Sequence, residues 1–376
     1  MTGQSPRVVM LSIDAFNPRY LLPEVTPTLW TLAAEGGYAP TGGWCDLPAA
    51  TYVSHATMLT GVSPARHRVI TNALGDLGYP KRPTWAGSPV VMQPTIFDLL
   101  EADGIRTAGV FGDQVLVKVV RAEAATRHWP PRGEVPTGVA TDQYGYCANG
   151  ATTDALLEVF ADTTLSFVFG HLNQTDTIGH IYGPDAPETR DAYASTDADI
   201  ARLLDALRPT WDETVVIVVS DHGMEPLDPA RVIDLDAVPG LDLVIDGWSA
   251  DGGAAVVHLR DGVEAPEGLA ALRRIAGIAT VEVAEPSILV AAVEPGAVFH
   301  RGPVQAGSDV PRGFHGGPAT QRTLSLVGGG HPAARTIGTA ISAAPPHLRD
   351  WVPTITALYG ISAGETDGAV LGDVRR

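Results

Sequence analysis

Six acidic and imidazole side chains recur where apolar runs of this chain end. They stand after the run 8–13 and in Asp-Thr-Ile-Gly-His, Ser-Asp-His-Gly-Met and Gly-Phe-His-Gly-Gly, and they are Asp14, Asp176, His180, Asp221, His222 and His315. Oxygen and nitrogen donors of this kind suit Zn²⁺ or a similar divalent ion, and six donors are enough for two ions. Two ions about 4 Å apart can clamp the attacking and leaving oxygens of a displacement at phosphorus. The pattern predicts a two-metal site for phosphoryl chemistry.

Each of these motifs also has an ordinary explanation when it is taken alone. An Asp after a strand usually caps a helix, and Asp-x-x-x-His arises often by chance. On its own His315 is a loop histidine, and His331 in Gly-Gly-Gly-His is equally attractive in isolation. The order of all the motifs together, each at the end of a strand pattern, favours a metal site.

A displacement at phosphorus also needs a nucleophile. Residues 48–55, Pro-Ala-Ala-Thr-Tyr-Val-Ser-His, place hydroxyl groups in a turn before the helical pattern 56–60. Such a hydroxyl usually caps the helix, whereas a metal ion beside it would lower its pKa and produce an alkoxide. The amides at the start of the helix would then face the phosphoryl oxygens.

Strand and helix patterns that alternate along the chain must position these groups. Strands are predicted at 8–13, 107–111, 165–169 and 215–219, and helices at 28–36, 96–104, 191–207 and 351–359. Such alternation favours an α/β fold with a mostly parallel central sheet sandwiched by helices. Ligand sites of these sheets lie outside the carboxyl ends of the strands.

The pattern changes at about residue 226 to shorter alternating pieces. Segments 254–259 and 280–283 indicate strands, and 268–275 indicates a helix, so we expect a small α+β insertion. The segment 323–327 is expected to return to the main sheet. The predicted units are a catalytic domain, 1–225 with 311–376, and an insertion or cap, 226–310. We expect this cap to lie over the site and to carry the residues that select the substrate.

The amino-acid composition limits the kinds of molecule that this chain can bind. The 376 residues include 25 Lys and Arg against 43 Asp and Glu, which gives a net charge of −18. A phosphate backbone would repel this chain, so we expect no binding to a nucleic-acid duplex but a small phosphorylated substrate. No signal-peptide or membrane-span pattern is present, and Cys45 with Cys147 is too few for a disulfide framework. We expect a cytoplasmic protein without membrane contact; the pairing of the two cysteines and the oligomeric state stay open.

The chain resembles the alkaline phosphatase superfamily, and most closely its nucleotide pyrophosphatase/phosphodiesterase branch. The matching motifs span nearly the whole chain in the family's order. They are the Asp14 strand, Thr-Pro-Thr-Leu-Trp-Thr-Leu-Ala-Ala-Glu-Gly (26–36), Thr-Tyr-Val-Ser-His (51–55), Leu-Thr-Gly-Val-Ser-Pro (59–64), Asp-Thr-Ile-Gly-His-Ile-Tyr-Gly-Pro (176–184), Ser-Asp-His-Gly-Met (220–224), Phe-His-Gly-Gly (314–317) and Val-Pro-Thr-Ile (352–355).

This resemblance implies roles for individual residues. It assigns one divalent ion to Asp176, His180 and His315, and a second to Asp14, Asp221 and His222. Zn²⁺ is the ion expected first at both sites. Thr51 becomes the nucleophile beside the second ion and forms a phospho-threonine intermediate. Asn72 would hold a phosphoryl oxygen, although without the resemblance it is better explained as a turn residue. Tyr52 stands where the family often has Phe, and is either a stacking surface for the substrate or a buried turn residue.

The resemblance implies hydrolysis of phosphate diesters or phosphoanhydrides. Phosphonoacetate hydrolases share this set of metal ligands and the motif Gly-Phe-His-Gly-Gly, so cleavage of a C–P bond is the alternative reaction. Hydrolysis of phosphomonoesters is the third. Those hydrolases place lysines on the substrate carboxylate after the strand near 107–111. Here only Lys118 stands near that place, with Arg121 and Arg127 as other cations that could serve.

Overall fold

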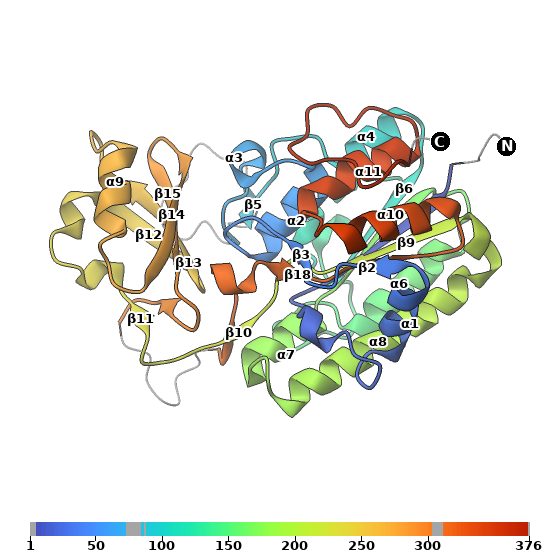
Figure 1. The fold of residues 1–376 in the computed structure, drawn as a ribbon, viewed down its shortest axis with the longest axis horizontal. Coiled ribbons are helices and arrows are strands. Elements are labelled where there is room, and N and C mark those ends of the chain that lie inside the picture. Colours follow the sequence, from blue (N-terminus) through green and yellow to red (C-terminus); the bar gives the residue numbers. More distant parts are fainter. Residues whose placement is uncertain (1–4, 73–83, 86–87, 303–310, 375–376) are drawn as a thin grey trace.

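The computed structural model describes residues 5–72, 84–85, 88–302 and 311–374, so the last residues of the predicted insertion lie outside the described part. A seven-stranded sheet lies at the centre of the larger unit (Figure 1). In spatial order its strands are β2 (Gly37–Tyr38), β19 (Ser325–Gly328), β9 (Thr214–Val219), β1 (Arg7–Ile13), β8 (Phe167–Leu172), β6 (Thr107–Phe111) and β7 (Arg127–Trp129). Strands β9 to β7 run parallel, and β19 and β2 pair antiparallel at one edge. The predicted α/β fold with a mostly parallel sheet is confirmed.

Helices cover both faces of this sheet, because successive side chains of each strand point to opposite faces. Val8 and Met10 of β1 pack in one apolar layer, and Val9 and Leu11 pack in the other. The first layer holds α2 (Thr51–Thr60), α4 (Ile96–Ala102), α5 (Leu116–Val119), α10 (Pro332–Ala343) and α11 (Trp351–Leu358). The second layer holds α1 (Pro27–Glu35), α6 (Asn149–Phe160) and α8 (Pro187–Leu207).

The strands predicted at 165–169 and 323–327 have other bounds in the structure, and β14 (Ile278–Glu285) is longer than the predicted 280–283. The strand expected at 165–169 is β8, Phe167–Leu172. Its second half contains the polar but fully buried His171, which hid the end of the strand from a search for apolar runs. The segment expected at 323–327 is divided between β18 (Arg322–Thr323), which pairs with β3 (Gly43–Trp44), and β19.

A second sheet has its own core beside the main sheet (Figure 1). Its four antiparallel strands are β12 (Ile245–Asp251), β13 (Ala254–Leu259), β15 (Ile288–Val293) and β14 (Ile278–Glu285), and α9 (Ala265–Leu272) packs on them. Trp248, Leu272 and Leu289 are buried in this core. The exact domain boundaries at 225/226 and 310/311 stay predictions.

Short elements complete the described chain. They are α3 (Pro64–His67), α7 (Gln174–Tyr182), β4 (Thr84–Trp85), β5 (Ser88–Pro89), β10 (Glu225–Pro226), β11 (Val232–Ile233), β16 (Val298–Phe299) and β17 (Gly313–Phe314). Strand β10 pairs with β17, and β11 pairs with β16. Within the described residues, no helix has the length and apolar character needed to cross a membrane.

Candidate active site

The carboxyl ends of the parallel strands bring the predicted metal ligands together. Asp14 directly follows β1, Asp221 stands two residues after β9, and Asp176 lies in α7 just beyond β8. Two groups of donor atoms each lie within 4.8 Å of one another: Asp176 with His222 and His315, and Asp14 with Asp221 and His222. Five of the six side chains thus form one buried cluster at the carboxyl edge of the sheet, and the sixth, His180, is half-buried beside Asp176.

Backbone carbonyls fix the orientation of the three histidines. Nδ1 of His180 lies 2.7 Å from the Gly313 carbonyl oxygen, and Nδ1 of His222 lies 3.0 Å from that of Gly223. His315 Nδ1 is likewise 3.0 Å from the carbonyl oxygen of Ala49. A carbonyl can only accept, so each Nδ1 carries the proton and each Nε2 presents its lone pair to the cluster. This is the arrangement that metal-bound histidines usually have.

Each of the three aspartates keeps a buried oxygen without a hydrogen-bond partner. Asp221 Oδ1 accepts from the amides of Ala15 and His222, and Oδ2 is unpartnered. His171 Nε2 lies 3.0 Å from Asp14 Oδ2, while Asp14 Oδ1 is unpartnered, as is Asp176 Oδ1. Buried carboxylate oxygens are costly unless they are paired or coordinate a metal. The donor set therefore fits divalent metal ions.

The charges of the cluster agree with this fit. Burial raises the pKa of Asp221 to about 6, and burial together with the charge of Asp221 raises that of Asp14 well above its ordinary value. Burial also lowers the pKa of His222 to about 4 and of His315 to about 3, so both rings are neutral at pH 7. Neutral imidazoles are ligands for a metal, and carboxylates so crowded need a positive charge between them.

His180 is the predicted ligand that is missing from the donor group in which we expected it. The first donor group contains His222 in its place, although His180 Nε2 is 3.3 Å from Asp176 Oδ1. His222 belongs to both groups and stacks on His315, with ring centroids 3.9 Å apart. The division of the six ligands between two ions stays a prediction.

Thr51 is the first residue of α2 and lies beside these ligands. Its Oγ1 is 3.2 Å from His222 Nε2, and the residue lines a pocket of about 300 Å³. Its neighbours in the pocket wall, among the predicted site residues, are Asp14, Tyr52, Asn72, Asp176, His180 and His315. His331, in contrast, caps α10, because its Nδ1 accepts from the amide of Ala333.

Asn72 is held at the pocket by hydrogen bonds to two other segments of the chain. Its Oδ1 accepts from the Tyr52 amide at 2.8 Å, and its own amide donates to Asp251 Oδ2 at 2.8 Å. The expectation that the first amides of α2 face a phosphoryl oxygen is therefore wrong for Tyr52, because that N–H holds Asn72. With Oδ1 engaged, Nδ2 is the polar atom of the Asn72 side chain that can serve a ligand.

The second sheet supports the site from beside it. Asp251 ends β12, and the amide of Gly253 donates to the His315 carbonyl at 2.7 Å. Gly252 has φ +61°, and a Cβ there would collide with the same carbonyl, so the turn between β12 and β13 needs glycine. None of the described lining residues lies within 226–310. The expectation that a cap over the site selects the substrate is not met by the described pocket wall.

Sequence patterns alone missed four residues of the pocket wall. Asp113, Tyr144, Tyr146 and Asn173 line it together with the predicted residues. Asp113 lies just beyond β6, as Asp14 lies just beyond β1, so the rule that found Asp14 could also have found Asp113. The two tyrosines lie in the loop before α6, where no local pattern marks them.

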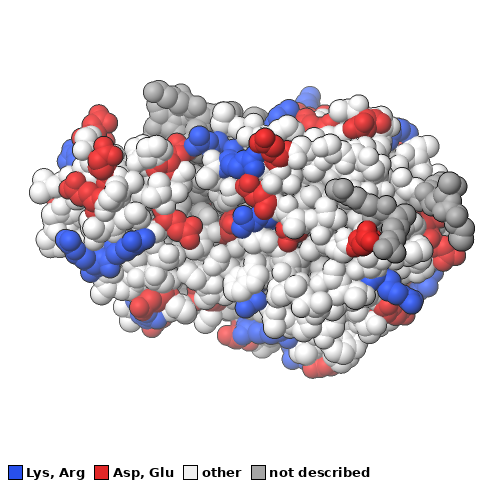
Figure 2. Space-filling view, turned by 45° about the horizontal axis from the view of Figure 1, so that its top comes forward, with Lys and Arg blue, Asp and Glu red and all other residues white. Residues whose placement is uncertain are grey.

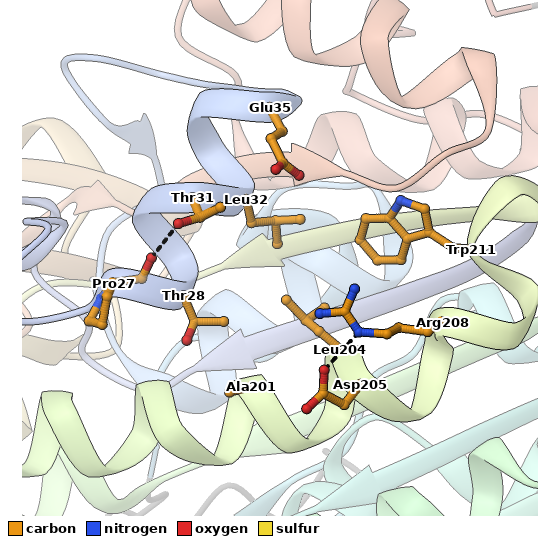
Figure 3. Close-up of a pocket in the computed structure, with 10 residues that line it drawn as sticks. All are labelled: Pro27, Thr28, Thr31, Leu32, Glu35, Ala201, Leu204, Asp205, Arg208 and Trp211. Atoms are coloured by element: carbon orange, nitrogen blue, oxygen red, sulfur yellow. Dashed lines mark hydrogen bonds and ion pairs between the residues drawn. The ribbon is translucent and has the colours of Figure 1, made fainter.

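A larger cavity of about 440 Å³ lies between α1 and the end of α8 (Figure 3). Glu35 on one side faces Arg208 and Trp211 on the other, and Arg208 pairs with Asp205 at 2.9 Å. No group of metal donors was found there among the described residues. The smaller pocket at the strand ends is therefore the candidate active site.

Fold and donor set together define a protein of the alkaline phosphatase-like class with a candidate metal-binding site. Residues 8–301 match the family model described as type I phosphodiesterase / nucleotide pyrophosphatase, and the chain belongs to this family. An uncharacterised pyrophosphatase/phosphodiesterase of Schizosaccharomyces pombe is 26% identical over 265 residues, which cover 65% of this chain and 50% of that protein. Human ectonucleotide pyrophosphatase/phosphodiesterase family member 7 is 26% identical over 242 residues, 60% of this chain and 49% of that protein.

This chain therefore spans about half the length of these two curated relatives. Among solved structures, murine ectonucleotide pyrophosphatase/phosphodiesterase 5 matches with a TM-score of 0.72 at 18% identity, covering 96% of this chain and 97% of that one. The match shows a shared fold. An inactive form of the murine protein, with a threonine replaced by alanine, has been solved in complex with AMP.

Proposed function

We propose that this chain hydrolyses phosphate diesters or phosphoanhydrides with two divalent metal ions and with Thr51 as nucleophile. Zn²⁺ is the ion that we propose first. The observation that carries the proposal is the position of Thr51, whose Oγ1 lies 3.2 Å from His222 Nε2 at the edge of both donor groups. Family membership supports the reaction class. The inactive threonine-to-alanine form of the murine relative agrees with a threonine nucleophile.

The residues of the pocket divide the work of such a reaction. When bound, the ions would lower the pKa of the attacking hydroxyl and offset the charge of the phosphoryl group. Thr51 Oγ1 loses its proton to solvent and attacks phosphorus, the bond to the leaving oxygen breaks, that oxygen takes a proton from solvent, and a phospho-threonine ester forms. Asn72 donates from Nδ2 to a phosphoryl oxygen, held in place by Tyr52 and Asp251. Water then cleaves the phospho-threonine ester.

Diester hydrolysis is favoured over C–P cleavage by the positions of the cations. Lys118 pairs with Glu123, and Arg121 pairs with Asp98 at 3.2 Å. Neither these residues nor Arg127 line the described pocket, which contains no Lys or Arg among its described residues. A substrate carboxylate would have to be desolvated without a cation to meet it, at a cost of roughly several kcal/mol.

The surface charge and the two cysteines support proposals on the binding partner and on the location of the protein. Acidic and basic residues alternate over the face in Figure 2, and no continuous basic surface covers the described residues there. This distribution favours a small phosphorylated substrate over a nucleic-acid duplex. Cys45 and Cys147 are separate and buried rather than paired, which agrees with the cytoplasmic location that we propose.

A panel of substrates tests the proposal. The Zn²⁺-loaded protein is assayed with bis(4-nitrophenyl) phosphate, a nucleotide, 4-nitrophenyl phosphate and phosphonoacetate. We expect kcat/KM for the diester or the nucleotide to exceed that for phosphonoacetate. Phosphonoacetate as the better substrate by about tenfold or more would reject the diesterase assignment and leave the metal site intact.

A further inference from the structure

Two of the predicted metal ligands belong to segments whose backbones lie very close together. His180 is in α7, and His315 follows β17, which begins at Gly313. The Gly313 carbonyl oxygen lies 2.7 Å from His180 Nδ1, and the His180 carbonyl accepts from the amide of Arg312 at 2.7 Å. A Cβ added to Gly313 would lie 2.5 Å from the carbonyl oxygen of Gly179 in α7. The approach of the two segments is therefore closer than a residue larger than glycine allows at Gly313.

The glycine inside α7 needs an explanation of its own, because glycine is a poor helix former. Gly179 stands between the predicted ligands Asp176 and His180. A Cβ on Gly179 would collide with Met224 Sδ, and a Cβ on Gly313 would lie 2.7 Å from the same sulfur. Met224 is 5% exposed, so its thioether fills the space beside both glycines. The missing side chains at these two positions make room for Met224.

Met224 contacts or adjoins three segments that carry predicted ligands. It stands two residues after His222 and directly before β10, and β10 pairs with β17. Its sulfur lies against α7 on one side and against the start of β17 on the other. Methionine is unbranched and has a polarizable sulfur, so it fills irregular gaps of this kind. Across this contact the rings of His180 and His315 have centroids 5.1 Å apart.

We propose that Met224 is a positioning residue of the metal site. Its thioether, packed on Gly179 and Gly313, keeps the helix of His180 at the distance from His315 at which both rings reach one ion. The inference rests on the proposed metal-dependent hydrolysis and adds to it a residue that touches neither ion nor substrate. The groups of a working site are held within about 0.5 Å of their best positions by packed side chains. Without the thioether, α7 and β17 can shift, and the ion loses part of its ligand set.

The Zn²⁺ affinities of variants at this contact test the inference. Met224→Ala leaves a cavity beside the two glycines, and the Kd of the ion expected at Asp176, His180 and His315 should rise by about 10- to 100-fold. The Kd of the other ion should change by less than about threefold, because Met224 does not separate the segments of Asp14 and Asp221. Met224→Leu keeps the apolar volume and should keep most of the affinity. Titration against a chelating dye gives both Kd values.

A methyl group added from the opposite side of the contact completes the test. Gly179→Ala favours the helix by itself, yet it should weaken the same ion, because the new methyl group collides with Met224. In the double variant Gly179→Ala/Met224→Ala the methyl group enters the vacated space, so the two losses should not add. Met58→Ala changes another buried methionine, in α2, and is the control. It should lower the Tm of the metal-free protein and keep both Kd values.

The outcomes separate this inference from the proposed function. Unchanged Kd values in Met224→Ala and Gly179→Ala, or an equal loss for both ions, would overturn the inference and leave metal-dependent hydrolysis standing. Should Met224→Ala fail to fold, Gly179→Ala decides the question alone. If the wild type binds two Zn²⁺ ions but hydrolyses no phosphodiester, the proposed function fails, and the Kd values still decide whether Met224 positions the ligands.

Discussion

The two walls of the active-site pocket are built in different ways. The six predicted metal ligands and Thr51, which we call the metal side, lie just beyond strand ends, in α7 and at the start of α2, and Asp221 and His222 are fully buried. The other wall residues Tyr52, Asp113, Tyr144 and Tyr146, which we call the tyrosine side, lie in α2, just beyond β6 and in the loop before α6, and Tyr144 is exposed. Strand ends in a packed sheet hold the atoms that react, whereas a loop can change its side chains without disturbing that sheet.

The largest effect is expected on the metal side. Thr51→Ala should lower kcat by roughly three orders of magnitude or more, because the nucleophile is lost, whereas the six ligands and the metal content remain. Thr51→Ser keeps a hydroxyl and should retain much of the activity. The measurement is kcat on an aryl phosphodiester together with elemental analysis of each variant. Wild-type turnover in Thr51→Ala would mean that water attacks directly.

A smaller effect is expected from His171, which contacts a ligand without being one of the six. Its Nε2 lies 3.0 Å from Asp14 Oδ2, and its Nδ1 accepts from the amide of Asp113 at 3.4 Å. His171→Phe should weaken metal binding by about 10- to 100-fold, as the loss of a hydrogen bond to a metal ligand usually does. The Kd comes from titration against a chelating dye, with His331→Gln, at the cap of α10, as control. An unchanged Kd would show that Asp14 needs no such support.

Variants of Asp251 and Asn72 test whether the second sheet contributes to catalysis by holding Asn72. Asn72→Ala should lower kcat by roughly tenfold, since one donor to the phosphoryl group is lost. Asp251→Ala frees the Asn72 backbone and should lower kcat in the same direction. Because both changes act through one side chain, the double variant should be little worse than Asn72→Ala. Additive losses in kcat would separate Asp251 from Asn72.

Much of the metal side could be predicted from the sequence, and little of the tyrosine side could. Asp14 directly follows one apolar strand and Asp221 stands two residues after another, so the parallel fold alone brings them to one edge. Asp142, in contrast, positions Tyr144 and Tyr146 through contacts with a helix more than 30 residues away. His171 was hidden inside a strand, where a polar residue breaks the apolar pattern.

The smallest effect concerns the helix scaffold behind Thr51. His67 is fully buried; its Nδ1 accepts from the Val69 amide, so its Nε2 donates to Thr57 Oγ1 in α2. Burial lowers the pKa of His67 from its ordinary 6.5 to about 3. Between these values the unfolded chain binds a proton that the folded chain does not, so stability rises with pH across this window.

The free energy of unfolding should therefore gain about 2 kcal/mol from this residue between pH 5 and pH 7.5. Urea denaturation at both pH values, for the wild type and for His67→Gln, measures it. The difference in pH dependence between the two proteins isolates His67 from the other titrating groups. Parallel pH dependence in both would contradict a neutral, buried ring.

The central claim is that the six Asp and His side chains bind the ions on which hydrolysis depends. It is tested most directly by measuring bound metal and activity on bis(4-nitrophenyl) phosphate in the same sample, through chelation and stepwise return of Zn²⁺. We predict that activity disappears with the metal and returns in full as two equivalents of Zn²⁺ bind. Full activity in excess chelator, with no metal found by elemental analysis, would contradict the account.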